Sequence, residues 1–174
     1  MASLWLLSCF TLIGVSVFIH PKFNLRSLYS DIALLKLASP AHFHHSVSPV
    51  PLPSDGGFFP SGTRCKIVGL GFLYLNRTVR PMRLQQATVP LLSVATCKHF
   101  WSIFSPYAMI CAGMEGASNY LGDSGGSLVC RKRRKWSLVG ILSFFEENHP
   151  TGRPFVVTRV SAFIPWIEEI MSQN

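Results

Sequence analysis

Short runs of apolar or β-branched residues recur along most of the chain, and Gly, Pro, Ser and Asn separate them. Many short strands joined by turns are typical of an antiparallel β-sandwich or β-barrel. We therefore expect an all-β fold. The expected strands are residues 17–19, 32–37, 66–70, 86–90, 127–130, 137–143 and 155–160.

Helical spacing is clear only near the C-terminus. Four apolar residues are spaced at i, i+3, i+4 and i+7, and two glutamates fall on the opposite face of the predicted helix. Pro165 is compatible only with the first turn of such a helix. The spacing predicts one C-terminal amphipathic helix that contains Phe163, Trp166, Ile167, Glu168, Glu169 and Ile170.

The first residues form an apolar leader. An apolar run covers residues 4–13, and no charged residue precedes Lys22. Small residues follow at positions 14–16, so the segment resembles a secretory signal peptide cleaved after Ser16, although the charged start typical of signals is missing. Two alternatives stay open. One is an uncleaved anchor over residues 2–19, which is barely long enough to span a bilayer; the other is a core strand or a product of splicing.

Cysteine number and a sequon agree with secretion. Of five cysteines, Cys9 lies in the leader, and the remaining four could pair in an oxidising compartment. The sequence has no CxxC spacing, so we do not expect a zinc ribbon. Asn76 begins an Asn-Arg-Thr sequon, so we expect a glycosylated extracellular protein.

Positive charge is in excess, with 16 Lys+Arg against 8 Asp+Glu. The excess suggests acidic partners without fixing a function. The densest cluster permits three interpretations: a solvated hairpin tip, a binding site for an acidic polysaccharide or a protein, and a cleavage site for a basic-residue convertase. We expect no nucleic-acid partner, because nuclear targeting conflicts with secretion. The cluster is Arg131, Lys132, Arg133, Arg134 and Lys135.

The segment over residues 39–62 is rich in Pro, Ser and Gly, so it is predicted to connect two units. Its histidines at 42, 44 and 45 could hold a metal, but histidines in linkers are usually exposed to solvent. We therefore expect no metal and no cofactor.

Candidate chemistry centres on Gly-Asp-Ser-Gly-Gly, residues 122–126. The glycines permit a tight turn that can aim the N–H groups of Gly122 and Ser124 at one point, which is how an oxyanion hole is built. Ser124 would then be the nucleophile. These five residues alone fit an ordinary surface loop equally well.

The wider sequence resembles the trypsin-like (chymotrypsin-fold) serine proteases. Residues 122–130 resemble the nucleophile motif, and residues 30–37 resemble the strand start that carries the catalytic aspartate, here Asp31. The resemblance extends over about residues 17–174. Further segments match in the same order, at residues 19–24, 65–71, 109–113 and 160–170.

The resemblance implies a double β-barrel with the active site between the barrels, and two disulfides, Cys65–Cys130 and Cys97–Cys111. With the apolar leader as a signal peptide over residues 1–16, or as an uncleaved anchor, the rest of the chain divides into two parts. Residues 17–49 would be a remnant of the first barrel with the linker. Residues 50–174 would be an intact second barrel with the C-terminal helix.

Two parts of the family's catalytic machinery have no match. The triad needs a histidine that accepts the serine proton. In the family this histidine precedes the aspartate in an Ala-His-Cys context, and none of the six histidines here matches that position. The Ile-Val-Gly-Gly-like N-terminus that would pair with Asp123 on activation is also without a match.

The substrate pocket also departs from the family pattern. Ser118 stands where the family places the residue at the pocket floor, and a serine there does not select Arg or Lys. Phe145 and Phe155 stand where the family has two wall glycines. We expect the two rings to fill the pocket; the alternative is a shifted loop that turns them elsewhere.

These departures predict a secreted, catalytically inactive serine-protease homologue that functions by binding. The alternative is a truncated form of an active Ser-His-Asp endopeptidase whose full-length product carries the histidine. A third possibility is a non-functional transcript.

Overall fold

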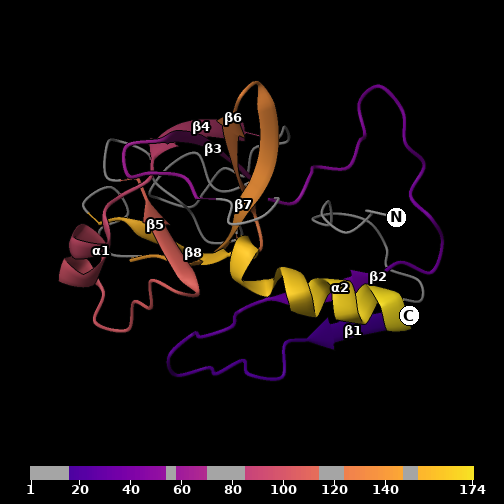
Figure 1. Ribbon diagram of the computed structural model, residues 1–174, viewed down its shortest axis with the longest axis horizontal. Helices are drawn as coiled ribbons and strands as arrows, with labels where there is room; N and C mark the ends of the chain where they lie inside the picture. Colours follow the sequence, from indigo (N-terminus) through magenta and orange to yellow (C-terminus); the bar gives the residue numbers. More distant parts are fainter. Residues whose placement is uncertain (1–15, 54–57, 70–84, 114–123, 147–152) are drawn as a thin grey trace, which may run out of the picture.

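The structure, a computed structural model, describes residues 16–53, 58–69, 85–113, 124–146 and 153–174. Within these residues, eight strands form two sheets (Figure 1). Strands β1 (Ser16–Ile19) and β2 (Ala33–Lys36) pair antiparallel as a small sheet. The other six strands form one antiparallel sheet in the order β4-β3-β6-β7-β8-β5 (Figure 1). They are β3 (Arg64–Gly69), β4 (Gln85–Pro90), β5 (Met109–Ala112), β6 (Ser127–Lys132), β7 (Lys135–Phe144) and β8 (Phe155–Arg159).

The six-stranded sheet curls until its two outer strands, β4 and β5, meet. Leu91, which follows β4, forms an antiparallel bridge with Ala112 of β5. The N–H of Gly113 donates to the carbonyl of Pro90 at 3.1 Å. The all-β fold class and the second barrel expected from the sequence are therefore confirmed. The small sheet is the part of a first barrel that the described residues contain.

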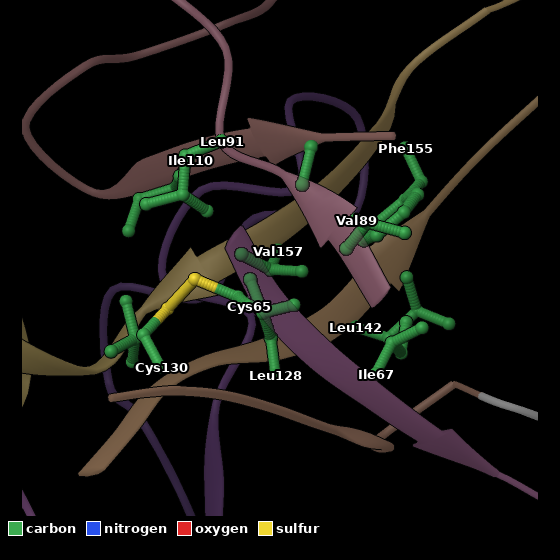
Figure 2. Close-up of a cluster of buried hydrophobic side chains, with 12 residues drawn as sticks. Cys65, Ile67, Val89, Leu91, Ile110, Leu128, Cys130, Leu142, Phe155 and Val157 are labelled. Atoms are coloured by element: carbon green, nitrogen blue, oxygen red, sulfur yellow. A yellow bond between two sulfur atoms is a disulfide. The ribbon is translucent and has the colours of Figure 1, made fainter. Parts of the chain in front are cut away.

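The barrel interior is filled by apolar side chains around the Cys65–Cys130 disulfide (Figure 2). Alternate residues of a strand point to opposite faces of the sheet, so every second side chain enters the barrel. In β6, Leu128 and Cys130 are buried, whereas Val129 and Arg131 are not. The cluster contains Cys65, Ile67, Val89, Leu91, Ile110, Ala112, Leu128, Cys130, Val139, Leu142, Phe155 and Val157.

A short helix, α1 (Val94–Phe100), lies against the outside of β5. The Ser93 side chain accepts a hydrogen bond from the N–H of Thr96 and so caps its first turn. The second disulfide, Cys97–Cys111, ties this helix to β5. Both disulfides join the cysteines that the family resemblance implied, whereas α1 itself was not predicted.

The C-terminal helix α2 (Ile164–Gln173) follows a single 3₁₀ turn, η1 (Val160–Phe163). Pro165 lies in its first turn, and Glu168 and Glu169 are exposed, as the spacing predicted. Phe163 and Ile167 are buried in one cluster with Ile32 and Leu34, so the helix covers the small sheet (Figure 1).

Residues 1–15 lie outside the described residues, so the signal peptide and the anchor over residues 2–19 stay predictions. Residues 16–19, at the end of that alternative anchor, belong to β1. Among the described residues, no helix is both long and apolar enough to cross a membrane.

Candidate active site

Ser124 is solvent-exposed in a turn that leads directly into β6. The turn is fastened to β7 by two backbone hydrogen bonds, one from the N–H of Gly125 to the carbonyl of Leu142 (2.8 Å), and one from the N–H of Leu142 to the carbonyl of Gly126 (2.9 Å). Gly125 has φ +83°, in the left-handed region that favours glycine, and no heavy atom lies within 4 Å of the place where a Cβ would be. The turn therefore needs glycine here for its backbone conformation and not for space.

Asp31 lies just before β2 and is held by hydroxyl groups from two barrel strands. Ser143 Oγ of β7 donates to Asp31 Oδ2 at 2.5 Å. Thr158 Oγ1 of β8 donates to the main-chain carbonyl of Asp31 at 2.7 Å. The aspartate is half-buried, and both its side chain and its backbone are thereby fixed against the barrel.

The backbone just before Asp31 is strained. Ser30 has φ +56°, an unfavourable conformation for a residue with a Cβ. It is buried, and its hydroxyl has no hydrogen-bond partner within the described part of the chain. Backbone strain at such a position is retained only when the surroundings hold it, and it clusters at functional sites.

One end of β7 brings the two candidate catalytic residues into the same neighbourhood. Leu142 contacts the Ser124 turn, and the next residue, Ser143, holds Asp31. The pairing of β7 with β8 shifts register between Leu142 and Phe144. Such a bulge redirects side chains, which explains how Ser143 reaches the aspartate.

The histidines whose positions the structure describes make contacts elsewhere. His20 stacks edge-on against Phe163 and Trp166, with ring centroids 5.1 and 4.8 Å apart, and its Nδ1 accepts from the N–H of Lys22. Desolvation by burial, and then the charge of Lys22, lower the pKa of His20. No hydrogen bond or ring contact joins a described histidine to Asp31 or Ser124.

The remaining described histidines lie in the linker or on α1. His44 Nδ1 accepts from the N–H of Ser46 at 3.3 Å, and its ring lies beside that of His45. His99 packs edge-on against Phe100 at the end of α1. In the described part of the chain, no group of three or more His, Cys, Asp or Glu residues could hold a metal ion.

The two candidate pocket phenylalanines share one apolar environment. Phe155 begins β8, is 3% exposed and belongs to the barrel core (Figure 2). Phe145, directly after β7, packs against the same cluster. A Cβ at Gly113 would lie 3.0 Å from the Phe155 ring, so the ring fills the space beside that glycine. The blocked pocket stays a prediction, because its proposed floor, Ser118, lies outside the described residues.

Several other candidate residues also lie outside the described residues. These are the oxyanion donor Gly122, the activation partner Asp123 and the glycosylation site Asn76. Their predicted roles stay predictions. The described part of the motif is Ser124, Gly125 and Gly126.

Sequence reasoning missed Ser143 and Thr158, the two residues that hold Asp31. Ser143 lies two residues before Phe145, and the sequence predicted a role only for that phenylalanine, in the pocket. Period-two alternation could not have shown that its hydroxyl turns to the aspartate, because a register shift lies at this point of β7.

Two comparisons with known proteins bear on this site. A family model described as "Trypsin" matches residues 10–167. Chymotrypsin-C from Rattus norvegicus is 36% identical over 160 residues, which cover 88% of this chain and 59% of that protein. The chain thus spans less than two thirds of the length of this relative.

Proposed function

Because the chain belongs to the trypsin-like family of serine proteases, peptidase family S1, we propose that it is a secreted family homologue with no endopeptidase activity of its own. Its function is then binding. The observation that carries the proposal is the environment of Asp31. No described histidine contacts its carboxylate, whose printed hydrogen bond comes from the Ser143 hydroxyl.

The chemistry of the nucleophile explains why this observation matters. A serine hydroxyl attacks a peptide carbonyl only when a base takes its proton, and that base also protonates the leaving amine. Loss of one triad member lowers turnover by about 10⁴–10⁶-fold. Ser124 in its exposed turn keeps the position of a nucleophile, but it has no partner that could activate it among the described residues.

Two disulfides support secretion. Cys65–Cys130 and Cys97–Cys111 are formed between buried cysteines, and such bonds persist in oxidising compartments. The apolar leader and the Asn76 sequon agree with this location. Secretion with removal of residues 1–16 and glycosylation at Asn76 is part of the proposal.

A cleavage assay tests the proposed lack of activity. The chain is expressed with its leader in mammalian cells, purified from the medium, and incubated with casein and a mixed peptide library. New peptide termini are then identified by mass spectrometry. The matched control is Ser124→Ala, and an active chymotrypsin is the positive control. We expect wild type and Ser124→Ala to give the same termini. Cleavage that Ser124→Ala abolishes would overturn the proposal.

A second candidate function is proteolysis by a longer product that includes this sequence. The anchored geometry of Asp31 favours it, because two hydroxyls fix the aspartate as a triad would require. The test is the coding sequence upstream of Met1. An in-frame Ala-His-Cys segment, together with Ser124-dependent cleavage by the longer product, would support this candidate. Absence of such a product from the secreting tissue would refute it.

A further inference from the structure

We propose that the β6–β7 hairpin and the adjoining face of β3 form a binding site for a sulfated polysaccharide of the heparin class. We call this site the basic face and define it as Lys66, Arg131, Lys132, Arg133, Arg134, Lys135 and Trp136. It goes beyond the proposed function, because it lies on the hairpin and on the outside of the barrel and uses neither Ser124 nor Asp31.

The first argument is the charge of the hairpin. Five basic residues follow one another from Arg131 to Lys135, and all five are exposed. Lys132 and Lys135 are direct cross-strand partners. Like charges at opposed positions destabilise a pair of strands, so strand pairing gives no reason for two lysines at these positions.

The turn supplies a second argument. Arg133 has φ +49° and Arg134 has φ +66°, so both residues of this two-residue turn lie in the left-handed region. Turns of this kind favour Asn-Gly, because a Cβ is unfavourable there. Two arginines therefore occupy the positions least suited to them, at the tip of a projecting hairpin (Figure 1). A need for charge at the tip explains their presence, whereas folding does not.

The third argument is that the charge continues onto the barrel. Lys66 of β3 pairs with Val129 of β6, which lies two residues before Arg131. The Lys66 ammonium lies 5.5 Å from the centre of the Trp136 ring, and the Arg131 guanidinium lies 5.8 Å from it. Trp136 thus holds two cations together on one outward face.

Lys132 extends the site along a second direction. Its ammonium donates to the carbonyl of Phe58 at 3.3 Å and lies 5.8 Å from the centre of the Phe59 ring. Lys132 therefore approaches the segment before β3, whereas Arg131 approaches Trp136. A linear polyanion could contact cations in both places at once.

Acidic residues on the same strands do not neutralise this charge. The four acidic residues within the described ranges are Asp31, Glu146, Glu168 and Glu169, and none belongs to β3, β4, β6 or β7. Clustered cations attract a polyanion and displace its counterions, so binding should weaken steeply with salt.

The surroundings favour a sulfated polysaccharide over other polyanions. The four residues of the tip, Lys132 to Lys135, are all cationic and none is apolar, so the tip offers charge and no side chain that inserts into a bilayer. The two disulfides indicate an oxidising compartment, where sulfated polysaccharides are abundant and nucleic acids are not.

Salt elution from immobilised heparin tests the basic face. The test variant is Arg133→Asn/Arg134→Gly, which removes two charges and gives the turn its preferred residues, so lost binding cannot come from misfolding. The control is Lys22→Gln/Arg26→Gln, which removes two exposed charges near the small sheet. We expect the test variant to elute at clearly lower salt and to bind heparin about tenfold more weakly at physiological salt, with equal or higher thermal stability. The control should match wild type.

Three results would overturn the proposal. Equal elution of wild type and the Arg133→Asn/Arg134→Gly variant would show that the basic face is not the heparin-binding site. Equal affinity for heparin, duplex DNA and phosphatidylserine vesicles would show that the site does not select sulfated polysaccharides. A secreted protein already cut between Arg131 and Lys135, by intact mass after reduction, would show that the cluster is a convertase site. None of these results depends on whether Ser124 is active.

Discussion

Ser143 and Asp31, 112 residues apart in the chain, are joined by a 2.5 Å hydrogen bond from the serine hydroxyl to the aspartate carboxylate. With the bond from Thr158 to the Asp31 carbonyl, it fastens the start of β2 to the six-stranded barrel. The same contact orients Asp31, the candidate catalytic aspartate. It is therefore both a structural link between the two sheets and the best-defined part of the candidate active site.

Replacing Ser143 by Ala should destabilise the fold. The Asp31 carboxylate would lose its hydroxyl donor in a half-buried place, and a hydrogen bond to a charged group contributes about 1.5–3 kcal/mol. Urea denaturation followed by fluorescence would measure the free energy of unfolding. Ser48→Ala, in the exposed linker, is the control and should change stability by less than about 0.5 kcal/mol. An equal effect of both variants would show that the Ser143–Asp31 bond contributes nothing.

Gly140→Ala should be destabilising for a steric reason. A Cβ on Gly140 would lie 2.3 Å from Cγ2 of Val157 and 2.9 Å from its Cβ. Forcing extra atoms into a packed core costs about 1–3 kcal/mol. Adding Val157→Ala should relieve part of the clash, so the double variant should lose less stability than the two single variants together. Strictly additive losses in urea denaturation would refute this contact.

Both disulfides should stabilise the fold, the Cys65–Cys130 bond more than the Cys97–Cys111 bond. The bonds close loops of 65 and 14 residues. The chain-entropy relation then gives about 4 kcal/mol for the first and about 3 kcal/mol for the second. Paired Cys→Ala substitutions at each bond, compared by urea denaturation, would measure the difference. A larger loss from the short-loop pair would contradict the entropic explanation.

Stability should fall as the pH drops below the ordinary pKa of histidine, about 6.5. Burial lowers the pKa of His20 in the folded state, so the unfolded chain binds the proton more readily. Stability is then highest above pH 6.5 and declines as the pH falls through the folded-state pKa.

Thermal melting of the His20→Gln variant at several values from pH 7.5 to pH 5 would check this dependence. Its melting temperature should vary less over this range than that of wild type. His42→Gln, at an exposed linker position, should retain the wild-type dependence. If His20→Gln also retained it, another group would have to be responsible.

Much of the fold was predictable because short apolar or β-branched runs, separated by turn residues, mark its strands. Period-two burial marks β6, where Leu128 and Cys130 point inward, and the seven predicted strands all overlap observed ones. Strand β5 was not in the predicted set; it has only four residues, and all four are buried. Ile110 and Ala112 pack into the barrel core, while Met109 and Cys111 pack toward α1. With both faces covered, no alternation appears.

Helix α1 escaped prediction for a related reason. It has only seven residues, and Cys97 is its only buried one, so it has no apolar stripe to recognise. The Ser93 cap was the available local signal. Tertiary attachment through Cys97–Cys111 stabilises this helix, and that attachment is not visible in local sequence.

The candidate site, like the fold, was predictable only in part. Ser124 and Asp31 were recognisable because local motifs carry them. Ser143 and Thr158 were not, because their contacts with Asp31 span 112 and 127 residues and, for Ser143, depend on a register shift in β7. Local sequence thus suggested the two candidate catalytic residues but not the residues that hold Asp31.

The most direct test of the central claim is labelling of Ser124 by a fluorophosphonate probe, which reacts with serines that are activated as nucleophiles. The secreted chain, its Ser124→Ala variant and an active chymotrypsin would be exposed to the probe for the same times and compared by in-gel fluorescence. The proposed lack of activity predicts that the secreted chain is labelled no faster than Ser124→Ala, while chymotrypsin is labelled fully. Labelling at a rate near that of chymotrypsin, and abolished by Ser124→Ala, would contradict it.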